Sequence, residues 1–303
     1  MAMQKELIDK ILKLKKKKKA VILVHNYQRP VIYKIADFIG DSLDLSIAAT
    51  ETTARIIVFC GVDFMAESAK ILNPEKKVLL PTKAATCPMA AMINATALRK
   101  FKKRHPGAAV VCYINTTAEV KAESDICCTS RNAGEIVNSL PNKQIIFVPD
   151  IHLAEYVQTQ TKKRIIPWKG YCYVHAAILA ETIKEAKKSH PKAEVIAHPE
   201  SPMEVLKLAD HVCGTGGMIK YAKQSKAKEF IVATEEGMTN RLKLEVPGKK
   251  FYPAAGVCFN QKAVNLKNVY ESLNREKYEI EVPEKVRIKA KKALDRMLEI
   301  SID

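Results

Sequence analysis

The chain has 303 residues, of which 47% are hydrophobic and 27% charged, a composition typical of a globular protein with room for two or three compact domains. No apolar run reaches the length of a membrane span, and the lysine-rich stretch 1–19 lacks the apolar centre of a signal peptide, so we expect a cytoplasmic protein that binds no membrane. The formal net charge of +17 is compatible with a nucleic-acid partner, but the lysines are scattered along the chain and only 6% of residues are aromatic. We therefore expect the positive charge to attract small anionic substrates instead.

The first third of the chain predicts alternating strands and helices. A lysine-rich amphipathic stretch at 1–19 precedes the apolar strand VILVHNY at 21–27 and a stretch of helical period at 31–36. Further apolar runs follow at 55–61 (RIIVFCG) and 76–81 (KKVLLP). Short apolar runs that alternate with helical stretches are typical of parallel sheets covered by helices on both faces.

The rest of the chain repeats this pattern twice. The first strand returns at 110–116 (VVCYINT) and 195–201 (VIAHPES), the third run as QIIFVPD and EFIVATE, and the fourth as KKRIIP and KKFYP. Such a recurrence in the same order at the same period is hard to produce by chance. We therefore predict an α/β fold of three pseudo-symmetric α/β/α domains, with parallel sheets around a central active site. The predicted domains are 1–86, 87–171 and 172–283, with a last helix at 284–303 near the first domain.

Polar residues recur at equivalent positions of the three copies. A polar pair closes each first strand, at spacings of 88 and 85 residues: His25 and Tyr27, Tyr113 and Asn115, His198 and Glu200. A hydroxyl follows 17 residues after the first member of each pair: Ser42, Ser130 and Thr215. Because ligands of such sheets bind beyond the carboxyl ends of the strands, we expect all these side chains to share one central cavity. The hydroxyls would cap helices there and, with free backbone amides, bind an anion.

A cysteine follows the fourth strand in every copy, at spacings of 85 and 86 residues: Cys87, Cys172 and Cys258. Each opens a predicted helix, a position that favours a lowered thiol pKa and a thiolate. Three converging thiolates could hold zinc or an iron–sulfur cluster. The lack of a C-x₂-C spacing weakens a structural zinc site, but zinc with three cysteines and a water stays open. On a [4Fe–4S] cluster, three thiolates would leave one iron open for Lewis-acid catalysis.

The remaining cysteines and two histidines have plainer explanations. Five cysteines lie on or beside apolar strands, and we expect them to pack in the core: Cys60, Cys112, Cys127, Cys128 and Cys213. His175 comes one helical turn after Cys172, so its ring could reach the cavity. His152 follows a strand of the second copy, and the sequence assigns it no role.

From about Ala20 to Val269, the chain resembles the A-type quinolinate synthases of bacterial and archaeal NAD biosynthesis. The resemblance rests on HNYQRP, IADFIGDSLDLS, FCGVDFMAESAKILNP, CPMA, CYINTTAEVKAESDICCTS, WKGYCYVH, AHPE, TGGM, TEEG and CFN. It implies a condensation of iminoaspartate with dihydroxyacetone phosphate to quinolinate, phosphate and water. It also implies one [4Fe–4S] cluster per chain, enclosed by the three domains. Whether the enzyme that makes iminoaspartate contacts this chain transiently stays open.

The resemblance further implies roles for individual residues. Cys87, Cys172 and Cys258 would bind the cluster, and Tyr27, His198 and Glu200 would be catalytic. The substrate contacts would be His25, Ser42, Tyr113, Asn115, Ser130, His198, Glu200 and Thr215. The alternatives are another non-redox iron–sulfur enzyme of the hydro-lyase kind, a radical or redox iron–sulfur protein, and a basic nucleic-acid-binding protein. A C-x₃-C-x₂-C run, which marks many radical enzymes, is absent from the sequence.

Overall fold

Three parallel sheets with one common strand order form the framework of the protein. The computed structural model describes residues 2–254 and 256–301. The first sheet consists, from edge to edge, of β2 (Phe38–Gly40), β1 (Ala20–His25), β3 (Ile56–Cys60) and β4 (Lys77–Leu79). The second consists of β6 (Ile126–Cys128), β5 (Ala109–Tyr113), β7 (Gln144–Val148) and β8 (Arg164–Pro167). The third consists of β10 (His211–Val212), β9 (Glu194–Ala197), β11 (Glu229–Ala233) and β12 (Lys250–Pro253).

Helices connect the strands and cover the sheets. The first part of the chain contains α1 (Ala2–Lys18), α2 (Pro30–Tyr33), α3 (Ser42–Glu51) and α4 (Asp63–Leu72). The second contains the 3₁₀ turn η1 (Ala90–Met92), α5 (Ala95–Lys103), α6 (Ala118–Ala122), α7 (Ala133–Ser139) and α8 (Ile151–Gln158). The third contains α9 (Tyr173–Ala176), α10 (Ala180–Ser189), α11 (Met203–Leu206), α12 (Thr215–Gln224) and α13 (Gly237–Glu245). The last helices are α14 (Phe259–Lys262), α15 (Leu266–Arg275) and α16 (Glu284–Ser301).

The strands are buried because helices cover both of their faces. In β5 every residue is buried, and β1 is buried from its second residue onward. Such strands need apolar side chains on both faces, which explains their unbroken apolar runs. One large core joins the first and second sheets, whereas the third sheet has a separate smaller core on each face.

Local capping sets where the helices near the strand ends begin. The Asp41 side chain accepts the amides of Leu43 and Asp44, and the Asp44 carboxylate in turn accepts the amide of Asp41. This reciprocal capping box starts α3 directly after β2. Asp150 caps α8 in the same manner by accepting the amide of Leu153 at 2.8 Å. The loops at the carboxyl ends of the strands are therefore fixed by short side chains.

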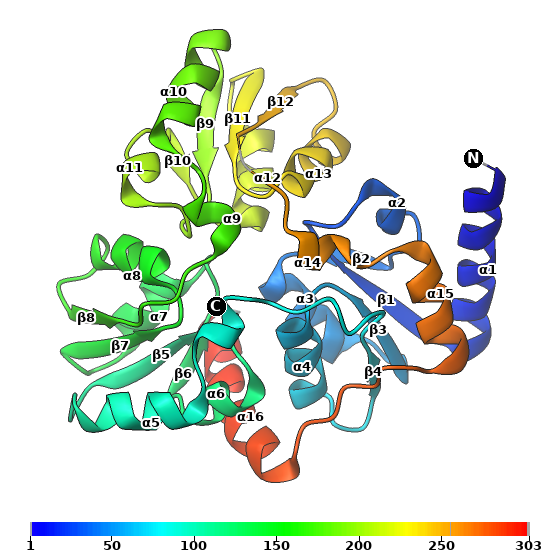
Figure 1. Ribbon diagram of the computed structural model, residues 1–303, viewed down its shortest axis with the longest axis horizontal. Coiled ribbons are helices and arrows are strands. Elements are labelled where there is room, and N and C mark those ends of the chain that lie inside the picture. Colours follow the sequence, from blue (N-terminus) through cyan, green and yellow to red (C-terminus); the bar gives the residue numbers. More distant parts are fainter. Residues whose placement is uncertain (1, 255, 302–303) are drawn as a thin grey trace.

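Figure 1 shows the three sheets grouped around a common centre, with α9 and α14 between them. The end of the chain returns to earlier parts: α15 packs along α1, and α16 packs against α6 and β6. The predicted α/β class with three parallel sheets flanked by helices is confirmed. The domain limits at residues 86, 171 and 283 stay predictions. Among the described helices, none is both long and apolar enough to cross a membrane.

Candidate active site

The carboxyl ends of the three sheets surround one cavity of about 80 Å³. Every residue that the sequence predicts for the site lines this cavity: His25, Tyr27, Ser42, Cys87, Tyr113, Asn115, Ser130, Cys172, His198, Glu200, Thr215 and Cys258. They come from all three repeats, so residues as far apart as His25 and Cys258 meet here. The predicted convergence of strand ends therefore exists in the folded chain.

The three cysteines of the cavity stand where short helices or turns begin. Cys172 is the N-cap of α9 and Cys258 that of α14, while the carbonyl of Cys87 accepts the amide of Ala91 at 3.3 Å. The prediction of a lowered thiol pKa is wrong, because burial raises the pKa of all three thiols. A metal that binds here has to displace protons from these cysteines.

The other five cysteines pack in the cores, as predicted. Four are fully buried within the core of the first two sheets: Cys60, Cys112, Cys127 and Cys128. Cys213 is half-buried against a core of the third sheet. His152 lies on α8, 3.6 Å from Glu155 of the same helix, and does not line the cavity. A position after the fourth strand of each copy therefore distinguishes the cysteines that line the cavity from those that pack in the cores.

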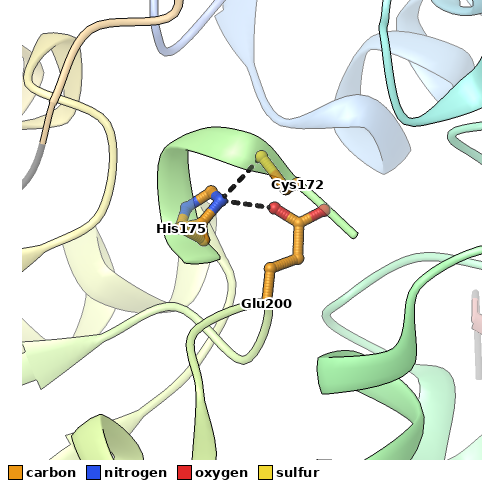
Figure 2. A group of neighbouring side chains, drawn as sticks. All are labelled: Cys172, His175 and Glu200. Atoms are coloured by element: carbon orange, nitrogen blue, oxygen red, sulfur yellow. Dashed lines mark hydrogen bonds and ion pairs between the residues drawn. The ribbon is translucent and has the colours of Figure 1, made fainter. Parts of the chain in front are cut away.

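Glu200 is a buried carboxylate between two histidine rings. Its Oε2 lies 2.8 Å from His175 Nδ1 and 3.4 Å from His198 Nδ1. Figure 2 shows His175 turned towards Glu200 and Cys172, whose Sγ is 3.2 Å from the same nitrogen. Burial by itself raises the pKa of Glu200, but the neighbouring histidines outweigh it and lower the pKa to about 2. Glu200 therefore stays ionised at neutral pH.

The same close group could bind a metal. The ligand atoms of Cys172, His175 and Glu200 all lie within 4.8 Å of one another. With the thiols of Cys87 and Cys258 on the same cavity, the site offers sulfur, nitrogen and oxygen donors. The cavity is therefore compatible with a metal cofactor, and His175 reaches it as its spacing from Cys172 indicated.

Thr234, which the sequence did not single out, connects Tyr27 to His175. Its hydroxyl is 2.7 Å from the Tyr27 hydroxyl and 2.8 Å from His175 Nε2. Since His175 Nδ1 contacts Glu200, hydrogen bonds run without a break from Tyr27 to Glu200. Burial, with the nearby Glu200 charge, raises the pKa of Tyr27 well above its usual value. The phenol therefore keeps its proton in the resting protein.

Two further histidines of the cavity are held neutral. His25 Nδ1 accepts the backbone amide of Tyr27 at 3.2 Å, and the two rings meet edge to face with centroids 4.7 Å apart. Burial, followed by the charge of Lys262, lowers the pKa of His25 to about 3. Burial also lowers the pKa of His198 to about 3. Neutral imidazoles can donate and accept a proton on different nitrogens, which suits orientation of a polar substrate.

The three hydroxyls lie where the helices after the second strands begin, but they are not the caps. The N-caps are Asp41 for α3, Asn132 for α7 and Gly214 for α12. The capping prediction is therefore wrong, since short polar or glycine residues beside the hydroxyls take that position. Thr215 accepts a hydrogen bond from Asn26 Nδ2 at 3.0 Å. Within the described residues, the hydroxyls of Ser42 and Ser130 form no hydrogen bond.

An ion pair from the third repeat fixes the Tyr27 loop of the first. Lys262 Nζ lies 2.9 Å from Glu235 Oε1 and also donates to the carbonyl of Tyr27. Next to it, Gln28 Nε2 donates to the carbonyl and side chain of Gln261 at 2.8 and 2.9 Å. Glu235 could have been found in the sequence, because it is the last residue of the third apolar run of its copy, EFIVATE. Gln261 and Lys262 follow Cys258 by three and four residues, where the other copies have different residue types after Cys87 and Cys172, so the repeat gave no signal for them.

All three repeats meet beside the hydroxyls. Arg131 Nη2 of the second repeat binds Asp41 Oδ2 and Asp44 Oδ1 of the first at 2.5 and 2.8 Å. Gly216 of the third repeat lies against them, since a Cβ there would come within 2.5 Å of Arg131 Nη2 and 2.8 Å of Asp41 Oδ2. A side chain at this position would displace the Arg131 guanidinium or the Asp41 carboxylate, which pair with each other.

Comparison with known proteins agrees with this architecture. The family model of quinolinate synthetase A protein matches residues 9–299. A quinolinate synthase of Methanosarcina barkeri is 54% identical over 301 residues, covering 99% of both chains. One of Dehalococcoides mccartyi is 52% identical over 301 residues (98% of this chain, 100% of the relative), and one of Alkaliphilus metalliredigens is 52% identical over 297 residues (97% and 98%). The chain therefore belongs to the quinolinate synthetase A family.

Proposed function

We propose that this protein condenses iminoaspartate with dihydroxyacetone phosphate to quinolinate, phosphate and water. Family membership makes the chain a quinolinate-forming condensing enzyme of NAD biosynthesis. The observation that supports the assignment of its site most directly is the single cavity lined by three cysteines and by polar groups of all three repeats. The proposal extends to the substrates, the cofactor and the role of each residue.

The proposed cofactor is one [4Fe–4S] cluster held by Cys87, Cys172 and Cys258. The donor chemistry fits, because these three thiols are free, half-buried and turned to one cavity, whereas four of the other five are sealed in a core. When bound, such a cluster supplies an iron without a protein ligand, which acts as a Lewis acid on a substrate oxygen. His175 and Glu200 bind each other at 2.8 Å and so have a role without being ligands.

The proposed substrates are anions, a dicarboxylate and a phosphate ester. The free hydroxyls of Ser42 and Ser130 and the hydroxyl of Thr215 offer donors at helix starts, where backbone amides also favour negative charge. Asn115 adds a buried Oδ1 that has no hydrogen-bond partner among the described residues. Buried polar atoms normally have partners, so this oxygen is suited to a ligand donor.

The proposed proton path runs along Tyr27, Thr234, His175 and Glu200. The raised pKa of Tyr27 keeps the phenol protonated, so that it has a proton to give, and the lowered pKa of Glu200 keeps a negative charge beside His175. When Tyr27 gives its proton to the substrate, the Thr234 hydroxyl can donate its own proton to the Tyr27 oxygen and take one from His175 Nε2. The phenol is then protonated again. Ring closure with loss of phosphate and water needs several such transfers.

Anaerobic purification followed by iron, sulfide and quinolinate assays tests the proposal. We expect about four iron and four sulfide per chain, lost when Cys87, Cys172 or Cys258 is changed to alanine and kept in Cys60→Ala. Tyr27→Phe should keep the cluster and lose quinolinate formation, whereas Tyr33→Phe, a buried tyrosine outside the cavity, should keep both.

Other outcomes would point elsewhere. Stoichiometric zinc without sulfide, in protein from iron-replete cells, would contradict the cluster. A loaded protein that makes no quinolinate from the two substrates would favour another non-redox iron–sulfur enzyme. The proposed location is the cytoplasm, where the eight free cysteines would stay reduced. A transient contact with the enzyme that makes iminoaspartate belongs to the proposal as well.

A further inference from the structure

Each repeat places an acidic residue between its third strand and the following helix. Asp63 comes three residues after β3, Asp150 two residues after β7 and Glu235 two residues after β11. Asp150 and Glu235 are fully buried, and Asp63 is half-buried. Buried carboxylates are costly unless hydrogen bonds or charges compensate them, so a recurrence in three repeats needs an explanation.

In two repeats the carboxylate accepts the backbone amide of the cavity cysteine. Asp63 Oδ1 lies 3.1 Å from the amide nitrogen of Cys87, and Glu235 Oε1 lies 3.0 Å from that of Cys258. In the second repeat, Asp150 Oδ1 accepts the amide of Leu153, and Asp150 Oδ2 has no hydrogen-bond partner among the described residues. Asp63 and Glu235 therefore contact cysteines that follow them by 24 and 23 positions.

Helix capping alone does not account for these contacts. Each acid also accepts an amide of its own helix start: Phe64 for Asp63, Leu153 for Asp150 and Gly237 for Glu235, at 2.7 to 2.8 Å. A cap would need only that local bond. For Asp63 and Glu235, the second bond joins the loop after the third strand to the cysteine loop after the fourth strand. Hydrogen bonds to a carboxylate are stronger than neutral ones, so they fix the cysteine backbone and the direction of its side chain.

We propose that Asp63 and Glu235 are positioning residues, which hold Cys87 and Cys258 in the geometry that the cluster requires. The inference rests on the proposed function, since it assumes that these cysteines bind the cluster. Outer residues that orient metal ligands typically change metal affinity by about 10- to 100-fold when they are replaced.

Asp63 offers the cleanest test, because Glu235 also pairs with Lys262. Asp63→Ala removes the acceptor for the Cys87 amide, whereas Asp63→Asn keeps an acceptor oxygen. Glu67→Ala is the matched control: Glu67 lies one turn along α4, is also half-buried, and accepts the amide of Ala118 instead of a cysteine. The readouts are the rate of iron and sulfide loss in air and the electron paramagnetic resonance spectrum of the chemically reduced cluster.

We expect Asp63→Ala to lose its cluster about tenfold faster than the wild type and to give an altered spectrum. Glu67→Ala should match the wild type in both readouts, and Asp63→Asn, which keeps a neutral acceptor, should fall between the wild type and Asp63→Ala. A wild-type rate and spectrum in Asp63→Ala would overturn the inference. If that variant does not fold, Glu235→Asp keeps the charge beside Lys262 but withdraws the oxygen from the Cys258 amide. It should also lose the cluster faster, and a wild-type rate would again overturn the inference.

The two proposals can fail separately. If the wild-type chain holds no iron and sulfide, the cluster of the proposed function is wrong. If the wild type holds the cluster and the Asp63 and Glu235 variants behave like it, only the positioning role is wrong.

Discussion

The two sides of the cavity differ in how completely their polar groups are paired. On the side of Tyr27, Thr234, His175 and Glu200, each group contacts the next at 2.7 to 2.8 Å. On a second part of the lining, the hydroxyls of Ser42 and Ser130 and Asn115 Oδ1 have no hydrogen-bond partner among the described residues. The first side forms a continuous hydrogen-bonded chain, with Glu200 Oε1 left without a partner among the described residues, and the second resembles a surface prepared for a ligand.

The difference follows from what each side would do. A group that transfers protons needs a fixed orientation and a fixed pKa, which a continuous hydrogen-bond network provides. A group that binds substrate must keep donors and acceptors free, since pairing them within the protein would have to be undone on binding. Replacements on the first side should therefore lower kcat, and replacements on the second should raise KM.

The largest effect is expected from Thr234→Val, which removes the hydroxyl between Tyr27 and His175 and keeps the shape of the side chain. The value of kcat for quinolinate formation should fall about 100-fold, as for loss of one proton-transfer group. Thr234→Ser should restore most of the activity, and Thr239→Val, a buried threonine of α13 outside the cavity, should have little effect. A normal kcat in Thr234→Val would remove the threonine from the proton path.

An intermediate effect is expected on the pH dependence of stability through His25. Its folded pKa is about 3, below the value of about 6.5 in the unfolded chain, so only the unfolded state gains a proton as pH falls below about 6.5. The free energy of unfolding should therefore drop, by about 2 kcal/mol between pH 7 and pH 5 from this group.

Chemical unfolding of the anaerobic protein at pH 7 and pH 5 measures this effect. His25→Gln should lose about 2 kcal/mol of the difference between the two pH values. His105→Gln, outside the cavity, should retain the full difference. An unchanged pH dependence in His25→Gln would show that the ring is not held neutral by the fold.

The smallest effect is expected from Ser42→Ala on the unpaired side. The KM for one of the two substrates should rise about tenfold, the cost of one hydrogen bond to a charged group, while kcat changes little. Ser46→Ala is the control, because Ser46 lies on the same helix and donates to the Ser42 carbonyl at 2.7 Å outside the cavity. A large fall of kcat in Ser42→Ala with unchanged KM would contradict the division of labour between the two sides.

Features that repeat along the chain could be predicted from the sequence. Three copies of one strand pattern must form three similar sheets, and the ends of parallel strands always lie at one edge. The polar pairs, the hydroxyls and the cysteines occupy the same positions in each copy, so their meeting in one cavity followed from the repeat. For the same reason Cys60 and Cys112, at positions without an equivalent in the cavity, were assigned to the core.

Features that depend on contacts between repeats were decided only by the tertiary structure. Thr234 and Lys262 matter because they touch Tyr27, more than 200 residues earlier, and no periodicity relates such residues. The thiol pKa values were predicted in the wrong direction, because a helix start lowers a pKa locally but burial depends on all three repeats. The sequence by itself determined which equivalent side chains of the three copies line the cavity, because strand order and repeat are local patterns. How those side chains pair, and which stay free, depends on distances that exist only once the three sheets have packed together.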